Sequence, residues 1–332
     1  MHVHRFEPAY LPGLRALIDN HLSTVVPGWA MTDGAVAAHL NRHPGEPVTD
    51  PWVTKRATLL VSEGWAVLAA AHLLRYGDGN EVGEHFRGAG EIGWLLSVPG
   101  RTEPAAAVLS EARKRLGLWG VRREEVCSGG LPVPAFGGVP DRWPHVADAL
   151  RAAGYEAGPG RREALYGGRL AGVAEPGDPP SPGLGVLRGV GKFGVRFSAV
   201  ADDGEEIGHL ECTPDLTAGG SMPALGGWAE LAELWVREGS RDGGVGSWLV
   251  GHAARWLLLA GCDRVVVCVD ENDEKAGAGA STDGAGGRCS PGWPGPGSPD
   301  ERCRDAATAS GGRILRVERP RPCRAFRAVV RR

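Results

Sequence analysis

The sequence predicts an α/β protein of two domains with mixed sheets, on three observations. The chain has 332 residues, about twice the usual size of one domain. Four prolines and three glycines fall within residues 172–183, a composition that opposes regular structure and indicates a linker. On both sides of this linker, turn-connected strands are followed by a helical pattern. We therefore expect two copies of one architecture.

The first copy is predicted to contain a hairpin, a third strand and two helices, in that order. The expected positions are residues 59–61, 66–73, 91–96, 105–119 and 143–153. The hairpin is indicated by apolar runs that flank a turn at Gly64. The helix over residues 105–119 is indicated by apolar residues at helical spacing.

The second copy repeats the hairpin, the third strand and the first helix, and a buried strand follows. The expected positions are residues 197–200, 207–210, 230–236, 245–259 and 265–269. The helix has an apolar stripe that includes Val245, Trp248 and Leu249. Gly261 then marks the end of the helix.

The most specific motif joins the third strand of the second copy to its helix. Arg241 is followed by glycines at 243, 244 and 246, and the helix begins among them. Glycines lack the Cβ atom that would block approach to the backbone, so the N–H groups can face an anion. The helix amino end favours negative charge, and an arginine can add a charge-assisted bond. The segment therefore predicts a cradle for a pyrophosphate.

The spacing Arg-x-x-Gly-x-Gly at residues 241–246 resembles the acetyl-CoA loop of the GNAT superfamily of N-acetyltransferases. The resemblance implies an α/β fold of two GNAT-like domains, each with a mixed sheet, the second one incomplete. It implies acetyl-CoA as the co-substrate and no metal. The residues that it implies for the cofactor are Trp235, Val236, Arg241, Asp242, Gly243, Gly244, Val245, Gly246, Ser247 and Asn272.

The resemblance also implies the reaction, in which a substrate amine attacks the acetyl thioester directly. Glu230 lies eleven residues before Arg241, at the place of the family's catalytic strand glutamate, and Glu233 is the second choice for the general base. In a regular strand these two acids face opposite sides, so only one would reach the cleft. A solvated or salt-bridged role for them is the alternative. For the whole chain, the alternative is a non-catalytic GNAT pair that binds CoA or a protein partner.

The first copy differs at the loop, where it reads Arg101-Thr102-Glu103-Pro104-Ala105-Ala106. Both glycine positions are lost, and Pro104 removes an N–H donor. We therefore expect that this copy does not bind CoA and has a structural or acceptor-shaping role. The predicted domains are an N-terminal GNAT-like domain, a linker, an acetyl-CoA-binding core and a basic tail, at residues 1–167, 168–184, 185–279 and 280–332.

The predicted tail has little apolar content or periodicity, which indicates disorder. A GNAT domain would continue here with a helix that carries a tyrosine, which reprotonates the leaving thiolate. No tyrosine follows Tyr166, and Cys268 is a weak substitute. Codons read in a shifted frame permit the missing ending near residue 287, so the tail is either an ordinary disordered segment or a frameshift product. The nucleotide sequence distinguishes these alternatives.

The composition of the chain limits which classes of binding partner and which cellular location we expect. The net charge of −3 gives no argument for a nucleic-acid partner. No apolar run approaches the roughly eighteen residues that a membrane span needs, and the amino end has no signal-like apolar core. Seven cysteines without CxxC pairs indicate neither a zinc site nor a disulfide framework. We expect a cytoplasmic enzyme whose acceptor, a small molecule or a peptide amine, the sequence leaves open.

Overall fold

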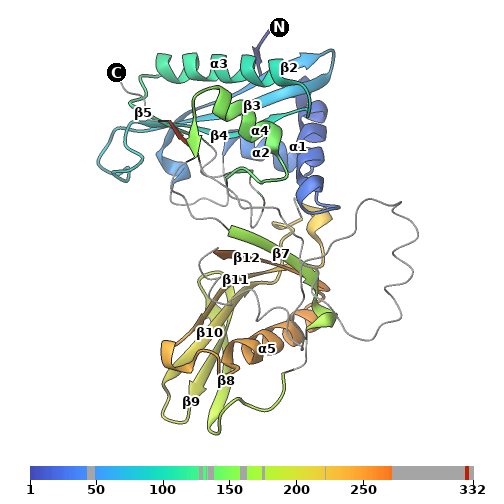
Figure 1. Ribbon diagram of the computed structural model, residues 1–332, viewed down its shortest axis with the longest axis vertical. Coiled ribbons are helices and arrows are strands. Elements are labelled where there is room, and N and C mark those ends of the chain that lie inside the picture. Colours follow the sequence, from blue (N-terminus) through green and yellow to red (C-terminus); the bar gives the residue numbers. More distant parts are fainter. Residues whose placement is uncertain are drawn as a thin grey trace, which may run out of the picture. The chain divides into compact units, whose positions relative to one another are not determined.

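The computed structural model (Figure 1) describes residues 1–42, 49–126, 130–131, 133, 138–157, 163–173, 176–220, 222–270 and 326–328. Contacts divide the chain into two compact units. Among the described residues, the first unit holds Met1–Ala164, Asp215–Gly226 and 326–328, and the second holds Leu165–Pro214 and 227–270. Each unit is built on its own mixed sheet, as the sequence predicts.

The sheet of the first unit has seven strands, of which β4 and β5 pair in parallel. In spatial order the strands are β1 (His4–Arg5), β2 (Val53–Glu63), β3 (Ala66–Tyr76), β4 (Ala89–Ser97), β5 (Arg123–Val126), β13 (Phe326–Ala328) and β6 (Glu156–Ala157). All of β4 is buried, because helices cover both faces of the sheet.

These helices pack on opposite sides of the first sheet (Figure 1). On one side, α3 (Thr102–Leu118) contacts β2, β3 and β4, and α4 (Pro144–Ala152) packs beside it. On the other side, α1 (Leu11–Val25) contacts β3 and β4, and α2 (Asp33–Asn41) contacts β2. The Thr32 side chain caps α2 by accepting a hydrogen bond of 3.1 Å from the Ala35 N–H.

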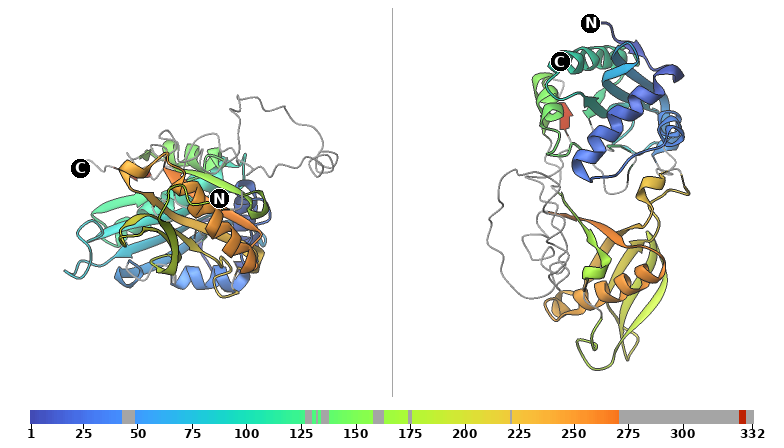
Figure 2. Two further views of the ribbon diagram at one scale, coloured as in Figure 1. Left: turned by 90° about the horizontal axis from the view of Figure 1, so that it is seen from below. Right: turned by 90° about the vertical axis from the view of Figure 1, so that its right-hand side faces the viewer.

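The sheet of the second unit has six strands, of which β11 and β12 pair in parallel. In spatial order the strands are β7 (Glu163–Arg169), β12 (Arg264–Asp270), β11 (Trp228–Val236), β10 (Glu206–Thr213), β9 (Gly194–Ala201) and β8 (Leu184–Gly191). One face packs on α5 (Val245–Leu259), as Figure 2 shows. Leu210, Ala229 and Leu249 belong to the core between them. Among the described residues of this unit, α5 is the only α-helix.

Every strand and helix expected in the two copies lies within or largely overlaps an observed element. The helix predicted at residues 245–259 is α5 itself, and its Gly261 stop has a φ of 87°, the left-handed conformation of a helix end. The sequence did not predict the helices α1 and α2 or the strands β1, β5, β7 and β8. Short 3-10 turns complete the structure at Pro8–Tyr10, Asp50–Trp52, Leu170–Gly172, Pro223–Leu225 and Glu238–Ser240.

Two segments pair in ways that sequence order does not indicate. β7 precedes the proline-rich segment in the chain yet belongs to the second sheet, beside β12. The described part of the predicted tail, Phe326–Ala328, forms β13, where Phe326 pairs with Val126 and Ala157. β13 lies between β5 and β6 and pairs with both through backbone groups, which do not depend on side-chain composition, so low apolar content did not exclude this pairing. The other residues of the tail lie outside the described part of the chain.

Candidate functional site

A similar β-bulge occurs in β11 of the second unit and in β4 of the first unit. In the second unit, Glu211 pairs with Glu233 and Cys212 pairs with Leu231, so Ala232 is an extra residue on β11. In the first unit, His72 pairs with Trp94 and Leu73 with Ile92, so Gly93 is the extra residue on β4. A bulge redirects the strand that carries it and often lies beside a functional site.

At each bulge the parallel neighbour leaves the strand. β11 and β12 pair from Trp228–Arg264 to Leu231–Val267, while β11 continues to Val236. β4 and β5 likewise pair from Ala89 to Ile92 of β4, which continues to Ser97. The strands therefore diverge after the bulge, and within the described residues the β12 side of the Trp235–Val236 backbone pairs with no strand. An extended ligand could add to such a backbone as a strand does.

The predicted anion cradle lies at the end of this diverging segment. Gly244, with a φ of 85°, precedes the first residue of α5, and Asp242 has a φ of 61°. Residues 241–244 are exposed. Within the described chain, no backbone carbonyl accepts a hydrogen bond from the N–H groups of Asp242 to Ser247. These donors are therefore available to an anion at the helix amino end.

Packing within the protein does not explain glycine at position 246. A Cβ atom there would lie 3.7 Å from the side chains of Leu234 and Val236, an ordinary van der Waals contact. Gly244 differs, because its left-handed backbone itself favours glycine. The fold could therefore accept a Cβ atom at position 246, and its packing does not require glycine there.

Arg241 is anchored at the base of the cradle. Its Nε donates a hydrogen bond of 3.1 Å to the Val236 carbonyl, which ties the loop to the end of β11. No carboxylate of the described chain forms an ion pair with its guanidinium. Trp248 Nε1 also donates to the Gly177 carbonyl at 3.2 Å, so part of the predicted linker packs beside the first turns of α5. Asn272, the remaining predicted cofactor residue, lies outside the described residues.

The bulge corrects the expectation that Glu230 and Glu233 face opposite sides of β11. Glu230 pairs with Thr213, and Glu233 pairs with Glu211. Because Thr213 and Glu211 are two residues apart on β10, they share a face, and so do their partners. Both acids therefore lie on the face opposite α5. Glu230 is partly buried, and this burial raises the pKa of its carboxyl, whereas the Glu233 side chain is 47% exposed.

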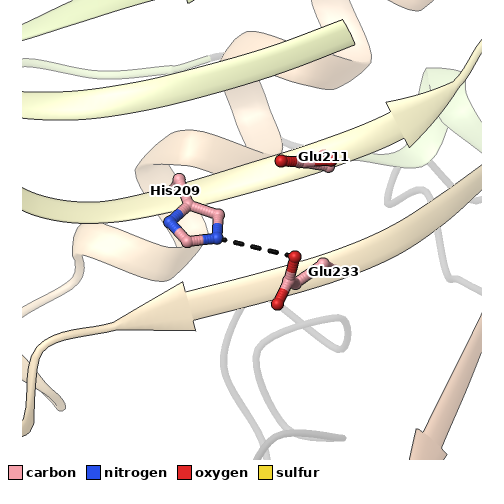
Figure 3. A group of neighbouring side chains, drawn as sticks. All are labelled: His209, Glu211 and Glu233. Atoms are coloured by element: carbon pink, nitrogen blue, oxygen red, sulfur yellow. Dashed lines mark ion pairs between the residues drawn. The ribbon is translucent and has the colours of Figure 1, made fainter. Parts of the chain in front are cut away.

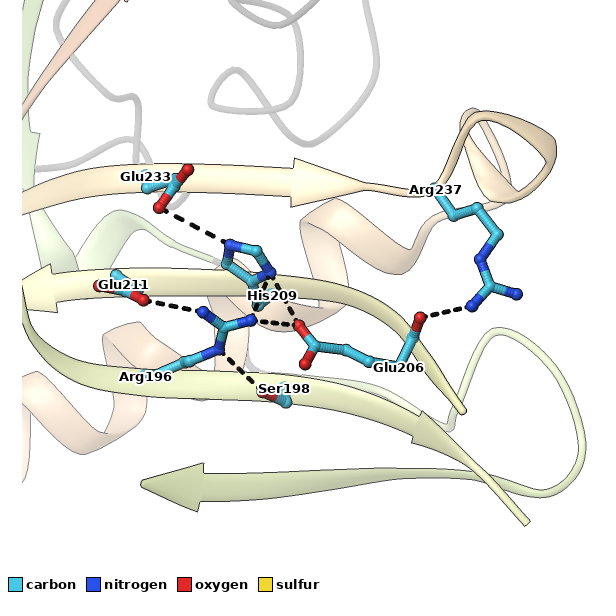
Figure 4. Close-up of polar contacts among 7 residues, drawn as sticks. All are labelled: Arg196, Ser198, Glu206, His209, Glu211, Glu233 and Arg237. Carbon is cyan, nitrogen blue, oxygen red and sulfur yellow. Dashed lines mark hydrogen bonds and ion pairs between the residues drawn. The ribbon is translucent and has the colours of Figure 1, made fainter. Parts of the chain in front are cut away.

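The same face carries a polar cluster that the sequence analysis missed (Figure 4). Arg196 donates to Glu211 at 3.0 Å, to Glu206 at 2.5 Å and to His209 Nδ1 at 2.9 Å. Glu211 also accepts the Phe193 N–H at 2.9 Å. Burial alone would raise the pKa of Glu211, but the Phe193 N–H and the Arg196 guanidinium hold it below its usual value. The sequence did hold a signal for this cluster, because polar residues recur two positions apart on each of the two hairpin strands, at Arg196 and Ser198 and at His209 and Glu211.

His209, Glu211 and Glu233 also approach the geometry of a metal site (Figure 3), with their ligand atoms within 4.8 Å of one another. The Arg196 guanidinium already places a positive charge 3.0 Å from the Glu211 carboxylate. A cation bound by Glu211 would compete with this ion pair. The cluster therefore does not form a firm metal site.

The first unit has different residues at the corresponding positions. By register from the bulge, Ala70, His72 and Trp94 stand where the second unit has His209, Glu211 and Glu233. Trp94 Nε1 donates to His39 of α2 at 2.9 Å, and the Trp94 ring stacks on His72 with centroids 5.6 Å apart. This face of the first sheet is thus filled by buried side chains.

Comparisons with known proteins agree with this architecture. Residues 188–278 match the model of the acetyltransferase (GNAT) family. A tandem GNAT protein from the clavulanic acid biosynthesis pathway, solved without acetyl-CoA, superposes with a TM-score of 0.54 at 14% identity, over 84% of this chain and 93% of its own. A GCN5-related N-acetyltransferase from Sphaerobacter thermophilus gives 0.52 at 12% identity, over 81% and 86%. A search of curated proteins gave no match.

A further structure with a similar fold is a glucosamine N-acetyltransferase region in a fungal multi-domain GH3 β-N-acetylglucosaminidase. It superposes with a TM-score of 0.53 at 13% identity, over 83% of this chain and 36% of its own. Similarity to structures at identities this low shows the fold and not the function. The chain therefore has the fold of tandem GNAT proteins, and residues 188–278 match the GNAT family model. This fold supports acetyltransferase activity in general. None of the helices in the described part of the chain is long and apolar enough to cross a membrane.

Proposed function

We propose that the second unit transfers an acetyl group from acetyl-CoA to an amine. The observation that carries the proposal is that two sets of backbone groups without a strand or carbonyl partner among the described residues follow each other along the chain. The edge of Trp235 and Val236 that pairs with no described strand leads directly to residues 242–247, whose N–H groups donate to no backbone carbonyl of the described chain. A ligand with an extended amide arm and an anionic diphosphate would use both sets of donors in turn.

In this proposal the pantetheine arm pairs with the backbone of Trp235 and Val236 as an added strand. A backbone N–H there polarises the thioester carbonyl, which stabilises the oxyanion that forms on attack. The diphosphate lies against Gly243, Gly244, Val245, Gly246 and Ser247. Arg241 and Asp242 fix the start of the loop, and the terminal nitrogens of Arg241 face the anion.

The acceptor amine must lose protons, and the face opposite α5 supplies carboxylates for this. Glu230 has a raised pKa because it is partly buried, which brings a carboxylate closer to the strength that a general base needs. Glu233 lies on the same face and is more exposed. We propose Glu230 and Glu233 as the acids that line the acceptor site.

We further propose that the first unit does not bind CoA. Where its strands diverge, the side chains of His21 and His145 lie near the Ser97 backbone. The unit's own side chains thus lie where a pantetheine arm would need the backbone. Arg101 forms an ion pair with Glu63 at 2.5 Å, and Pro104 offers no N–H to an anion.

The test is calorimetry of the full chain with acetyl-CoA, followed by a thiol-release assay with a panel of primary amines. Binding together with amine-dependent release of CoA supports the proposal. Binding without release with any amine supports a non-catalytic CoA-binding module. Absence of binding contradicts the proposal.

A further inference from the structure

We propose that a groove between α5 and the edge strand β8 binds a small aromatic carboxylate, at a site separate from the one proposed for acetyl-CoA. The groove has a volume of about 470 Å³, within the usual range for sites that bind small molecules. Its lining combines aromatic and aliphatic side chains with two arginines and one histidine. The inference goes beyond the proposed acetyltransferase function and does not depend on it.

The first wall of the groove comes from β8, the edge strand of the second sheet. Arg188 pairs with Phe197 of β9, and Val186 pairs with Ala199. Phe197 and Ala199 belong to the core beneath α5. Residues that pair across neighbouring strands share a face, so Val186 and Arg188 also lie on the α5 face of the sheet.

The second wall is one side of α5, formed by side chains three and four residues apart along the helix. These are His252, Arg255, Trp256 and Leu259. Leu259 is 82% exposed, and Trp256 is half-buried. The helix therefore offers apolar surface to a ligand that arrives from solution.

The groove carries positive charge that the described residues do not neutralise. Arg188 and Arg255 are exposed, and no carboxylate of the described chain forms an ion pair with either guanidinium. No acidic residue within the described ranges lines the groove. A carboxylate would supply the counter-charge, and its two oxygens match the planar N–H donors of a guanidinium.

Two aromatic rings favour a ligand that itself carries a ring. The rings of Phe197 and Trp256 meet edge to face, with their centroids 6.0 Å apart. The Arg188 guanidinium lies 5.7 Å from the centroid of the Trp256 ring. A ligand ring that packs on Trp256 can therefore place its carboxylate next to Arg188.

His252 adds a polar group without a charge. Burial, and then the positive charge of Arg255, lower the pKa of His252 below its usual value. At neutral pH the imidazole is therefore neutral, and it offers one N–H donor. Two cations, one neutral donor and an otherwise apolar lining suit a single carboxylate on an apolar body.

The groove lies apart from the proposed active site. Its first residue on α5, His252, is about two helical turns beyond Gly246 of the glycine loop. β10 separates β8 and β9 from the diverging β11, and Glu230 and Glu233 lie on the opposite face of the sheet. A ligand in the groove would therefore contact neither the pantetheine arm nor the acceptor, so the two sites should fill independently.

The test is calorimetry of the full chain with 2-naphthoate as the probe. The groove variants are Arg188→Gln and Arg255→Gln, which replace exposed side chains. Arg264→Gln is the matched control, because the Arg264 guanidinium lies 5.1 Å from the centroid of the Trp228 ring, outside the groove in the same unit. Each groove variant should raise the Kd for 2-naphthoate about 10-fold. The control, and the affinity of both groove variants for acetyl-CoA, should stay within about twofold of wild type.

Competition identifies the chemistry of the ligand. Decanoate and inorganic phosphate should displace 2-naphthoate weakly or not at all, because neither carries a ring. Displacement by phosphate, or tighter binding of decanoate, overturns the aromatic class. No binding of 2-naphthoate, or equal binding by all variants, overturns the site itself. Displacement by acetyl-CoA overturns the separation from the cofactor site. The proposed acetyl transfer stands in each of these cases, because the thiol-release assay tests it separately.

Discussion

Replacing Gly246 with alanine separates the proposed cofactor site from the stability of the fold. The added Cβ would lie 3.7 Å from the side chains of Leu234 and Val236, so the fold can accept it without a clash. Gly246 lies in the first turn of α5, where alanine is favoured over glycine by about 0.5–1 kcal/mol. We therefore expect the second unit to keep its stability or gain up to about 1 kcal/mol.

If the diphosphate lies against residues 243–247 as proposed, the same methyl group would narrow its approach to the backbone N–H groups of the loop. Loss of one charge-assisted hydrogen bond costs about 1.5–3 kcal/mol, which corresponds to an increase of roughly 10-fold or more in Kd. Calorimetry with acetyl-CoA measures the affinity, and chemical denaturation measures the stability. The variant is thus predicted to be at least as stable as the wild type and to bind more weakly.

Gly117→Ala is the matched control, because Gly117 lies in α3 of the first unit and has nothing within 4 Å of an added Cβ. It should bring a similar gain in stability without any change in affinity for acetyl-CoA. If Gly246→Ala binds acetyl-CoA as tightly as wild type, the loop does not hold the diphosphate, and the reasoning from glycine spacing is refuted.

Three further predictions concern single charged groups. Arg241→Ala should raise the Kd for acetyl-CoA about 10-fold, while Arg101→Ala in the first unit should leave it unchanged; equal effects in calorimetry would contradict the assignment to the second unit. Glu211→Gln should destabilise the second unit by about 2 kcal/mol at pH 7, measured by urea unfolding. The pKa of Glu211 is lowered in the folded protein, so the stability that its charge contributes is lost as pH falls, and the difference between variant and wild type should shrink in acid. A difference that stays constant with pH would show that the charge is not the cause. Glu230→Gln should raise the free energy of unfolding at pH 7, and this gain should disappear below about pH 4.5. The reason is that a carboxyl whose pKa is raised in the folded protein lowers stability as pH rises. A variant that is less stable than wild type at pH 7 would refute this.

The elements that the sequence predicted are those with a local signal. The helix at residues 245–259 has an apolar stripe that starts after glycines and ends before Gly261, and the structure has the same bounds. The hairpins were indicated by apolar runs around a turn, and they lie within observed strands. Short-range patterns of this kind depend on few partners, so they can be interpreted without the rest of the fold.

Features that depend on distant partners were not predicted. The bulge at Ala232 is a property of the register between two strands, and it reversed the expected orientation of Glu233 relative to Glu230. The place of β7 in the second sheet follows from pairing with β12, about a hundred positions later. The Arg196–Glu206–His209 cluster forms only when β9 and β10 pair.

A crystal structure of the full chain with acetyl-CoA bound tests the central claim most directly. We predict the diphosphate against the N–H groups of residues 243–247 and the pantetheine arm along Trp235 and Val236 where β11 leaves β12. Acetyl-CoA bound in the first unit, or bound elsewhere on the second with this loop unoccupied, would contradict the account.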